Sequence, residues 1–305
     1  MTRITASLIS ASLLALTINP GPAQAQPARV FVAAQGSDAN LCTFAQPCRT
    51  FQHAHDVVVA GGEIDVLDPA GYGAVNITKS LSIQGHGFSG ITVTGGNAIS
   101  INAPEDAIVN LNGLLLEGSG TGDFGIGLST AGFVTITNTV IRRFALSGLG
   151  LGPRNVLRTA IINVSNTIVA NNGQSGAVVQ PFNAQKLTVA SFSRVEAYGN
   201  GQEGIFINAS FTTERVFTTA VDCVAVGNGF VGLFGGVHAK GASALVGIVR
   251  SVVTGNDLFD VFTEDSAVIE IGGSQVFSWL GGHIVSYGDN YKREGFAAET
   301  TIPRQ

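Results

Sequence analysis

Three charged residues recur at a fixed interval in the second half of the chain, and their side chains suggest specific chemistry. Arg194, Asp222 and Arg250 follow one another at equal, 28-residue spacing. A guanidinium pairs with a carboxylate through two parallel hydrogen bonds, so this column could bind the carboxylates of an acidic glycan. The alternative is a surface ion ladder, in which Asp222 neutralises its neighbours and the net stabilisation is small.

Cleavage of a polysaccharide needs other side chains, and the sequence does not place them in register. Hydrolysis needs two carboxylates across the glycosidic bond, and metal-assisted elimination needs acidic ligands beside a base. No acidic residue is followed by another at the 28-residue interval; Glu203, for example, is followed by Val231. His86, within a Gly-His-Gly turn, has no Asp-Asp pair to accompany it. Because an enzyme could take its acids from different columns, catalysis stays open as the alternative.

The sequence predicts neither a cofactor nor a metal site. The five histidines are not spaced as zinc ligands around a cysteine pair. The densest acidic stretch could offer oxygen ligands to calcium, but it lacks the nonapeptide signature of calcium-binding repeats, which favours an exposed turn. The residues of this stretch are Asp257, Asp260, Glu264 and Asp265.

Asparagine recurs at the same interval and predicts the architecture. Asn172, Asn200, Asn228 and Asn256 are equally spaced, and each is followed by an apolar run. A repeat this short cannot bury its own apolar face, so successive coils must stack as parallel strands about 4.8 Å apart. With the usual handedness of parallel crossovers, the sequence predicts an all-β, right-handed parallel β-helix of about eight or nine coils.

Turn chemistry explains these asparagines without a ligand. Asparagine tolerates the left-handed backbone region that a sharp bend demands. Asparagines stacked in successive coils can also hydrogen-bond to one another as a ladder. We therefore expect Asn172, Asn200, Asn228 and Asn256 to lie in one line at a bend and to serve structure.

A second column consists of Phe206, Phe234 and Phe262. Because phenylalanine buries a large apolar area, we expect these rings to stack in the core. If this face points outward, the column would instead form a hydrophobic strip suited to sugar rings or to a partner. Alternation along the strand does not decide between the two, because Ile205 and Ile207 on the opposite face are equally apolar.

The N-terminal segment, residues 1–25, has the features of a secretory signal peptide. A positive charge at Arg3 precedes an apolar run, and Ala23-Gln24-Ala25 matches a cleavage site, so this segment is predicted to be removed. We therefore expect an exported protein, periplasmic or extracellular. No later stretch is long and apolar enough for a membrane span.

Residues 26–62 are predicted to form an N-terminal cap. In an oxidising compartment Cys42 and Cys48, which bracket a short loop, are expected to form a disulfide; two free thiols are the alternative. Apolar residues at helical spacing follow between residues 50 and 60. This helix would cover the first coil, whose strand edges would otherwise be open to pairing with other chains.

The rest of the chain is predicted to be β-helix, residues 63–291, and a polar C-terminal tail, residues 292–305. Hydrophobic residues make up 45% of the sequence and charged residues 12%, a composition that supports a continuous core. The formal net charge of -5 provides no basic surface for phosphates, so nucleic acid is excluded as a partner.

Several short motifs lie in a fixed order between residues 30 and 87, and one more lies near the end. They are Gly36-Ser37-Asp38, Asn40-Leu41-Cys42-Thr43, Pro47-Cys48-Arg49-Thr50-Phe51, Gly61-Gly62-Glu63-Ile64-Asp65-Val66-Leu67-Asp68, Gly71-Tyr72-Gly73, Ile77-Thr78-Lys79-Ser80-Leu81-Ser82-Ile83 and Ser286-Tyr287-Gly288-Asp289-Asn290. With these motifs the chain resembles exported bacterial proteins of the pectin-lyase-like β-helix superfamily. The resemblance implies the fold and not an activity, because the superfamily includes lyases, hydrolases and adhesins.

These observations favour an exported β-helix scaffold without catalytic residues. Its predicted role is to bind carbohydrate or to associate with the cell envelope, and its predicted partner is an acidic polysaccharide or an envelope component. The alternative is a polysaccharide lyase or glycoside hydrolase that acts on an acidic glycan.

Overall fold

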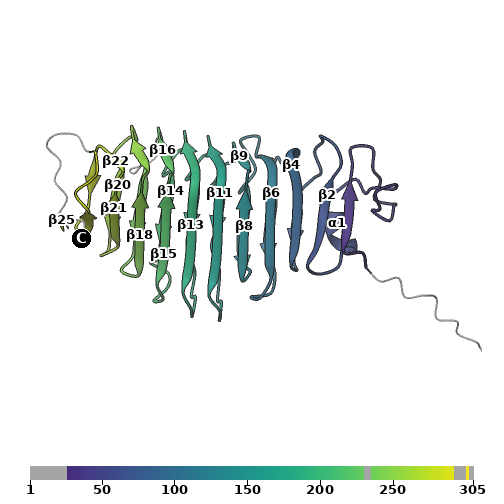
Figure 1. Cartoon of the computed structure of the whole chain (residues 1–305), viewed down its shortest axis with the longest axis horizontal. Coiled ribbons are helices and arrows are strands. Elements are labelled where there is room, and N and C mark those ends of the chain that lie inside the picture. The colour runs from purple at the N-terminus through teal and green to yellow at the C-terminus, as the bar shows by residue number, and fades with distance from the viewer. Residues whose placement is uncertain (1–25, 230–234, 292–299, 302–305) are drawn as a thin grey trace, which may run out of the picture.

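The strands of the chain wind into an elongated parallel solenoid (Figure 1). We analysed a computed structural model, which describes residues 26–229, 235–291 and 300–301. The predicted signal peptide, residues 1–25, and most of the predicted tail lie outside the described residues. The all-β solenoid predicted from the repeat is confirmed.

A 16-stranded sheet, called the first sheet below, follows the whole length of the solenoid. All of its paired strands are parallel. Its main path consists of β1 (Arg29–Val32), β2 (Gly62–Val66), β4 (Leu81–Thr92), β6 (Ile108–Glu117), β8 (Phe133–Thr137), β11 (Ala160–Ala170), β13 (Thr188–Tyr198), β15 (Val216–Val221), β18 (Ala244–Val249), β21 (Val268–Gly272), β24 (Ile284–Ser286) and β25 (Thr300–Thr301). Beside this path lie β9 (Val140–Arg142), β16 (Val224–Val226), β19 (Val252–Thr254) and β22 (Gln275–Val276).

A nine-stranded second sheet contains one short strand from each coil. Its strands are β3 (Val75–Ile77), β5 (Ile99–Asn102), β7 (Ile126–Thr130), β10 (Leu149–Leu151), β12 (Ala177–Val179), β14 (Ile205–Asn208), β17 (Val237–Lys240), β20 (Val261–Glu264) and β23 (Trp279–Leu280). In most strands of both sheets buried and partly exposed residues alternate, and the buried Val, Ile, Leu and Ala side chains form one core.

The 28-residue step is regular in the middle of the solenoid and varies toward both ends. Ala190 of β13 pairs with Ile162 of β11 and with Thr218 of β15, one such step away on either side. In the second sheet Ile205 pairs with Val237, which is a longer, 32-residue step. The loops between strands absorb these differences in length, so the strands still stack although the coils differ in size.

The four repeated asparagines stack as predicted from their spacing. Their side chains hydrogen-bond in series: Asn172 Nδ2 donates to Asn200 Oδ1 at 2.9 Å, Asn200 Nδ2 to Asn228 Oδ1 at 2.9 Å, and Asn228 Nδ2 to Asn256 Oδ1 at 3.0 Å. Each Oδ1 also accepts the backbone N–H of the preceding asparagine in the ladder. The ladder is almost fully buried over its first three members.

The backbone reason that we gave for these asparagines is wrong. None of the four has a positive φ; the left-handed conformation falls one residue earlier, at Asn171, Gly199, Gly227 and Gly255. The bend therefore needs a glycine or asparagine just before the ladder. The ladder asparagines themselves are there for their side-chain amides, which satisfy each other inside the solenoid.

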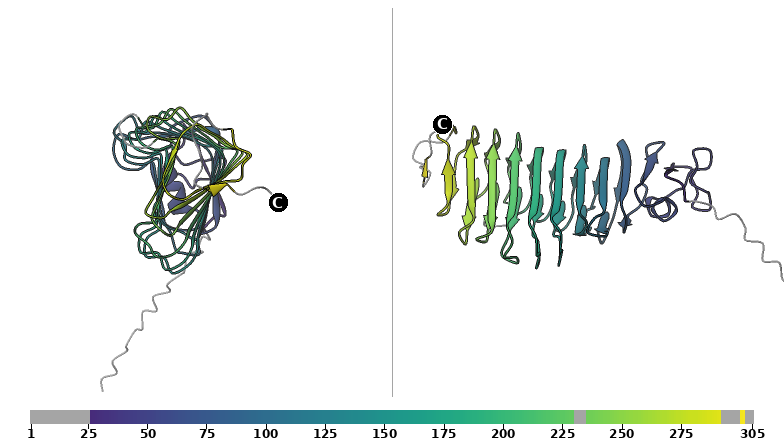
Figure 2. Two further views of the ribbon diagram at one scale, coloured as in Figure 1. Left: turned by 90° about the vertical axis from the view of Figure 1, so that its left-hand side faces the viewer. Right: turned by 60° about the horizontal axis from the view of Figure 1, so that its bottom comes forward.

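The N-terminal region forms the predicted helix, α1 (Phe51–Val57). Thr50 caps it by accepting a hydrogen bond from the His53 N–H at 3.2 Å. Phe51 and Ala54 are fully buried, and the helix contacts β1, β2 and β3. Viewed along the solenoid, α1 lies inside the outline of the coils (Figure 2).

The cap also contains a strand that we did not predict. β1 pairs with β2 in parallel, so the first sheet begins inside residues 26–62. Cys42 and Cys48 form the predicted disulfide, and the backbone N–H of Cys48 bonds to β1 at Phe31 O. At the other end, β25 in the predicted tail pairs with β24. In the described part of the chain no helix is long and apolar enough to cross a membrane.

Candidate functional site

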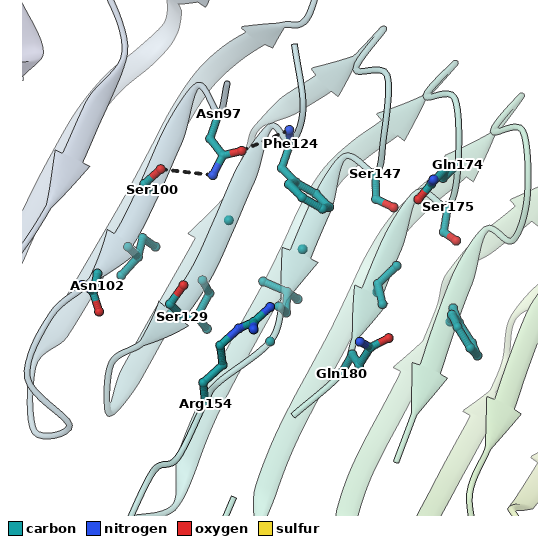
Figure 3. A pocket seen from close by; sticks show the side chains of 18 of the residues that line it. Asn97, Ser100, Asn102, Phe124, Ser129, Ser147, Arg154, Gln174, Ser175 and Gln180 are labelled. Atoms are coloured by element: carbon teal, nitrogen blue, oxygen red, sulfur yellow. Dashed lines mark hydrogen bonds between the residues drawn. The ribbon is translucent and has the colours of Figure 1, made fainter. Parts of the chain in front are cut away.

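A groove of about 400 Å³ crosses the outer face of the second sheet from β5 to β14 (Figure 3). It runs across five successive strands, that is, along the solenoid axis. Stacked parallel strands repeat at about 4.8 Å, so its length suits a chain-like ligand better than a compact one.

The floor of the groove consists of residues that pair side by side in the second sheet. Ser100, Gly127, Gly150, Val178 and Phe206 form this row, one from each strand. Their neighbours in the strands are buried, so these five positions point outward. The two glycines have no side chains of their own, so side chains of the groove wall can approach the middle of the floor.

Each of these glycines lies under a side chain of the groove wall. A Cβ atom at Gly127 would lie 2.6 Å from Asn97 Nδ2, and one at Gly150 would lie 2.8 Å from Phe124 Cδ1. Both separations are far shorter than an ordinary van der Waals contact. Glycine is therefore needed at both positions for Asn97 and Phe124 to lie against the floor.

One wall comes from the turns that precede the short strands, and its polar groups are held in place. Asn97 Nδ2 donates to Ser100 Oγ at 3.1 Å, and Asn97 Oδ1 accepts the backbone N–H of Phe124 at 3.3 Å (Figure 3). Further along, this wall continues with Ser147, Gln174, Ser175 and Gln202. The wall thus offers amides and hydroxyls beside one aromatic ring.

The opposite wall follows the ends of the short strands and carries a cation. Its polar members are Asn102, Ser129, Arg154 and Gln180. In the described part of the chain Arg154 forms no ion pair, and no acidic residue lines the groove. The lining therefore has a single positive charge among neutral hydrogen-bonding groups.

A carboxylate lies behind the groove wall but is closed off from the groove. Glu203 is 5% exposed and is not among the lining residues. Its Oε2 accepts a hydrogen bond from Ser175 Oγ at 2.6 Å, and its Oε1 lies 3.1 Å from His238 Nδ1. This arrangement fixes Ser175, and it leaves Glu203 without access to a ligand in the groove.

Arg194, Asp222 and Arg250 share one column, at a corner of the first sheet and away from the groove. All three have positive φ, between 45° and 55°. Arg250 pairs with Asp222, and its hydrogen bond lowers the pKa of that carboxyl. Arg194 Nε instead donates to Asn166 Oδ1 at 2.6 Å. The column therefore contains one ion pair and one arginine bonded to a neutral amide.

The expected phenylalanine column is wrong in two respects. The 32-residue step places His238 between Phe206 and Phe262, with ring centroids 4.5 Å and 4.9 Å from theirs. Because Ile205 and Ile207 are buried, this stack faces outward and is not part of the core. Phe234 lies outside the described residues. The stack follows Phe206 along the same row of the second sheet, but His238 is only 3% exposed and neither His238 nor Phe262 lines the groove.

The acidic stretch near the C-terminal end makes contacts within the protein. Asp260 accepts hydrogen bonds from Asn256 and from the backbone N–H groups of residues 277 and 278. Glu264 pairs with Lys240 at 2.8 Å. The metal-capable cluster within the described ranges is Cys42, Cys48 and His53, whose two sulfurs are joined as a disulfide.

Phe206 belongs to a column that the sequence singled out, but the groove residues of β5 and β7 were missed because these coils do not follow the 28-residue step. Ile99, Ile126 and Leu149 pair in sequence, although the two steps between them are unequal and both are shorter than that interval. The usable signal is local: Ile126-Gly-Leu128 and Leu149-Gly-Leu151 are strands with glycine at the outward position. Glycine is costly inside a strand and often marks the close approach of another group.

Several solved structures align with most of the chain, at low sequence identity. Pectate lyase Pel9A aligns with a TM-score of 0.61 and 14% identity, covering 89% of this chain and 79% of that one. The A-module of the mannuronan C-5 epimerase AlgE4 of Azotobacter vinelandii aligns with a TM-score of 0.54 and 17% identity, covering 76% and 67%. ORF18 of Geobacillus virus E2 aligns with a TM-score of 0.56 and 12% identity, covering 90% and 60%.

No protein-family model and no curated protein sequence matches the chain. At these identities the structural likeness establishes the fold alone. The chain has the parallel β-helix fold of the pectin-lyase-like proteins.

Proposed function

We propose that this protein is an exported β-helix that binds an acidic polysaccharide in the groove of the second sheet without cleaving it. The observation that carries the proposal is the lining of the groove: amides, hydroxyls, two aromatic rings and Arg154, with no acidic residue. Amides and hydroxyls suit the many hydroxyl groups of a sugar chain. The guanidinium suits a sugar carboxylate.

The direction of the groove agrees with a polymeric ligand. The groove follows the solenoid axis, so a linear glycan can lie across several coils at once. Two of the similar structures are named for pectate and mannuronan, which are acidic polysaccharides. The Cys42–Cys48 disulfide supports export to an oxidising compartment.

The catalytic alternative is a lyase or hydrolase that acts on the same class of glycan. Its support is that two similar structures carry the names of a lyase and an epimerase. Against it, a glycosidase needs two carboxylates facing the scissile bond. The carboxylate beside the groove, Glu203, is buried and bonded to Ser175 and His238.

One experiment separates the two functions. The mature protein is incubated with polygalacturonate, alginate and a neutral glucan, with and without calcium, and both binding and released ends are measured. We expect binding to the acidic polymers and no release of reducing or unsaturated ends. Released ends would establish the catalytic alternative, and the absence of binding to every polymer would overturn the proposal.

Glycine substitutions test whether the groove is the binding site. Gly127→Ala and Gly150→Ala would displace Asn97 and Phe124. Gly247→Ala, on a strand of the first sheet, places its Cβ at an ordinary van der Waals distance, 3.9 Å, from Thr219 Cγ2. We expect the first two to weaken glycan binding and the third to leave it unchanged. Equal affinities in all three would place the site elsewhere.

The column of Arg194, Asp222 and Arg250 remains a second candidate for carboxylate binding. Arg194 is the member better suited to it, because its partner Asn166 is neutral, whereas Arg250 already holds Asp222. The test is the double variant Arg194→Ala and Arg250→Ala. Unchanged affinity for the acidic polymers would show that the column does not bind them and serves only as a structural ladder.

A further inference from the structure

Three neighbouring loops extend beyond the lower ends of β11, β13 and β15 (Figure 1). They span residues 152–159, 180–187 and 209–215 and join the short strands to the first sheet. Two of them expose a phenylalanine: Phe182 is 45% exposed and Phe211 is 47% exposed. Single exposed apolar residues are normal on a protein surface, so the arrangement of these two matters more than their number.

The two rings form a pair. Their centroids are 5.7 Å apart, and their planes differ by 29°. The loop backbones hold them in register, since Asn155 N–H bonds to Phe182 O and Asn183 N–H to Phe211 O. Asn183 Nδ2 also donates to Asn155 Oδ1 at 2.8 Å. The pair is thus fixed by coil-to-coil stacking, as the strands are.

Arg154 connects this aromatic pair with the groove. Its side chain lines the groove, and its guanidinium carbon lies 5.9 Å from the ring centroid of Phe182. A guanidinium that lies over an aromatic ring can still donate hydrogen bonds to an anion, because its N–H groups point outward in the plane of the guanidinium itself. The cation therefore lies on the groove wall, next to the aromatic pair.

The same loops have an excess of positive charge. Together they carry Arg154, Arg158, Lys186 and Arg215 against one acidic residue, Glu214. The four cationic side chains are all exposed. The whole chain has a formal charge of -5, so these loops concentrate the opposite sign. Charge complementarity favours a polyanion at this surface.

We infer that Arg154, Phe182 and Phe211 form an additional subsite for a uronate-containing chain that leaves the groove. Arg154 binds a sugar carboxylate through its planar fork. Phe182 and Phe211 contact the apolar C–H faces of the following sugar rings. The inference rests on the proposed function and adds to it the position and residues that select acidic sugars. Binding here is non-covalent, and no bond of the glycan changes.

The length of the ligand tests the subsite separately from the groove. The affinities of a galacturonate trisaccharide and of a galacturonate oligomer of about ten residues are measured by calorimetry. The groove spans only about 20 Å over five strands, so the longer oligomer must extend beyond it, whereas the trisaccharide fits inside. In the double variant Phe182→Ala and Phe211→Ala we expect the longer oligomer to bind about tenfold more weakly, about 1.4 kcal/mol. The trisaccharide should bind as before. The matched control is Phe44→Ala, another exposed phenylalanine.

Charge selectivity tests the role of Arg154. We expect Arg154→Gln and Arg154→Lys both to weaken binding of the galacturonate oligomer, because lysine lacks the planar fork. Arg158→Gln, which removes the same charge from an exposed position on the same loop, should have a smaller effect. A neutral oligomer of the same length should bind equally to all of these proteins.

The outcomes separate failure of the subsite from failure of the proposed function. If the unchanged protein binds neither oligomer, both are overturned. If it binds both oligomers and the double phenylalanine variant loses nothing, the subsite alone is overturned. Phe-dependent binding to vesicles of phosphatidylglycerol without oligomer binding would assign the loops to an anionic membrane surface and would also overturn the inference.

Discussion

Arg250 holds Asp222 through two hydrogen bonds, Nε to Oδ1 at 2.8 Å and NH2 to Oδ2 at 3.0 Å. Both residues have positive φ, 45° and 55°. In the two preceding coils the same position holds Asn166 and Arg194, again with positive φ. The corner thus imposes one backbone conformation on different side chains, and the ion pair forms because successive coils bring the two side chains together.

Arg250→Ala should raise the pKa of Asp222 toward its usual value. The hydrogen bond from Arg250 is the largest cause of the lowered pKa, and the charge of Arg194 is a smaller one. A carboxyl NMR titration in each single variant measures the effect. We expect a larger rise in Arg250→Ala than in Arg194→Ala, and the reverse order would contradict the observed pairing. Because Asp222 is exposed, added salt should reduce the difference.

Asn200→Ala should strongly destabilise the protein. Asn200 Oδ1 accepts both the backbone N–H and Nδ2 of Asn172, so the variant leaves two buried donors without partners. We expect a loss of about 3 kcal/mol in the free energy of unfolding, measured by denaturant titration. The control is Asn183→Gly, which removes an exposed ladder amide where φ is +49° and should cost far less. Similar losses in both variants would argue against the importance of burial.

Glu117→Gln should lower stability at neutral pH but not at acidic pH. Burial raises the pKa of Glu117, but hydrogen bonds from Arg143, the Ser119 N–H and Arg142 outweigh it, so the pKa is lowered. Because the pKa is lowered in the folded state, the ionised carboxylate stabilises the fold at every pH above the pKa of glutamate in the unfolded chain, which is about 4.3. This contribution disappears as the pH falls through the pKa of Glu117 in the folded protein.

Unfolding of the unchanged protein and of Glu117→Gln is therefore compared between pH 7 and pH 2. At pH 7 we expect the free energy of unfolding to be about 2 kcal/mol lower in the variant, because charged hydrogen bonds are lost. This difference should shrink as the pH approaches 2. The conservative variant Glu117→Asp should retain part of the pH dependence. A difference that stays constant with pH would show that Glu117 acts through packing rather than charge.

Thiol counting should distinguish the three cysteines. Cys42 and Cys48 are joined, whereas Cys223 is buried, and this burial raises the pKa of its thiol. In the native oxidised protein we expect little alkylation, in denaturant one alkylated residue, and after reduction in denaturant three. Mass spectrometry of the alkylated protein gives these counts. Three alkylated residues without reduction would show that the disulfide does not form in solution.

The sequence alone determined the fold class and the central register. Identical spacing of Asn172, Asn200 and Asn228 requires coils of equal length, and coils this short can bury apolar side chains only by stacking. The same arithmetic placed Arg194, Asp222 and Arg250 in one column, because the intervening loops have equal lengths. Local signals also located helix α1 and the disulfide.

Only the tertiary structure decided which face each column presents and where a groove opens. Ile205 and Phe206 are equally apolar, and only the position of the first sheet makes one core and the other surface. The longer step that brings His238 beside Phe206 depends on how much chain the intervening loop takes up. The groove requires Gly127 and Gly150 to become neighbours over a step shorter than the repeat, and strand pairing rather than sequence spacing sets that contact.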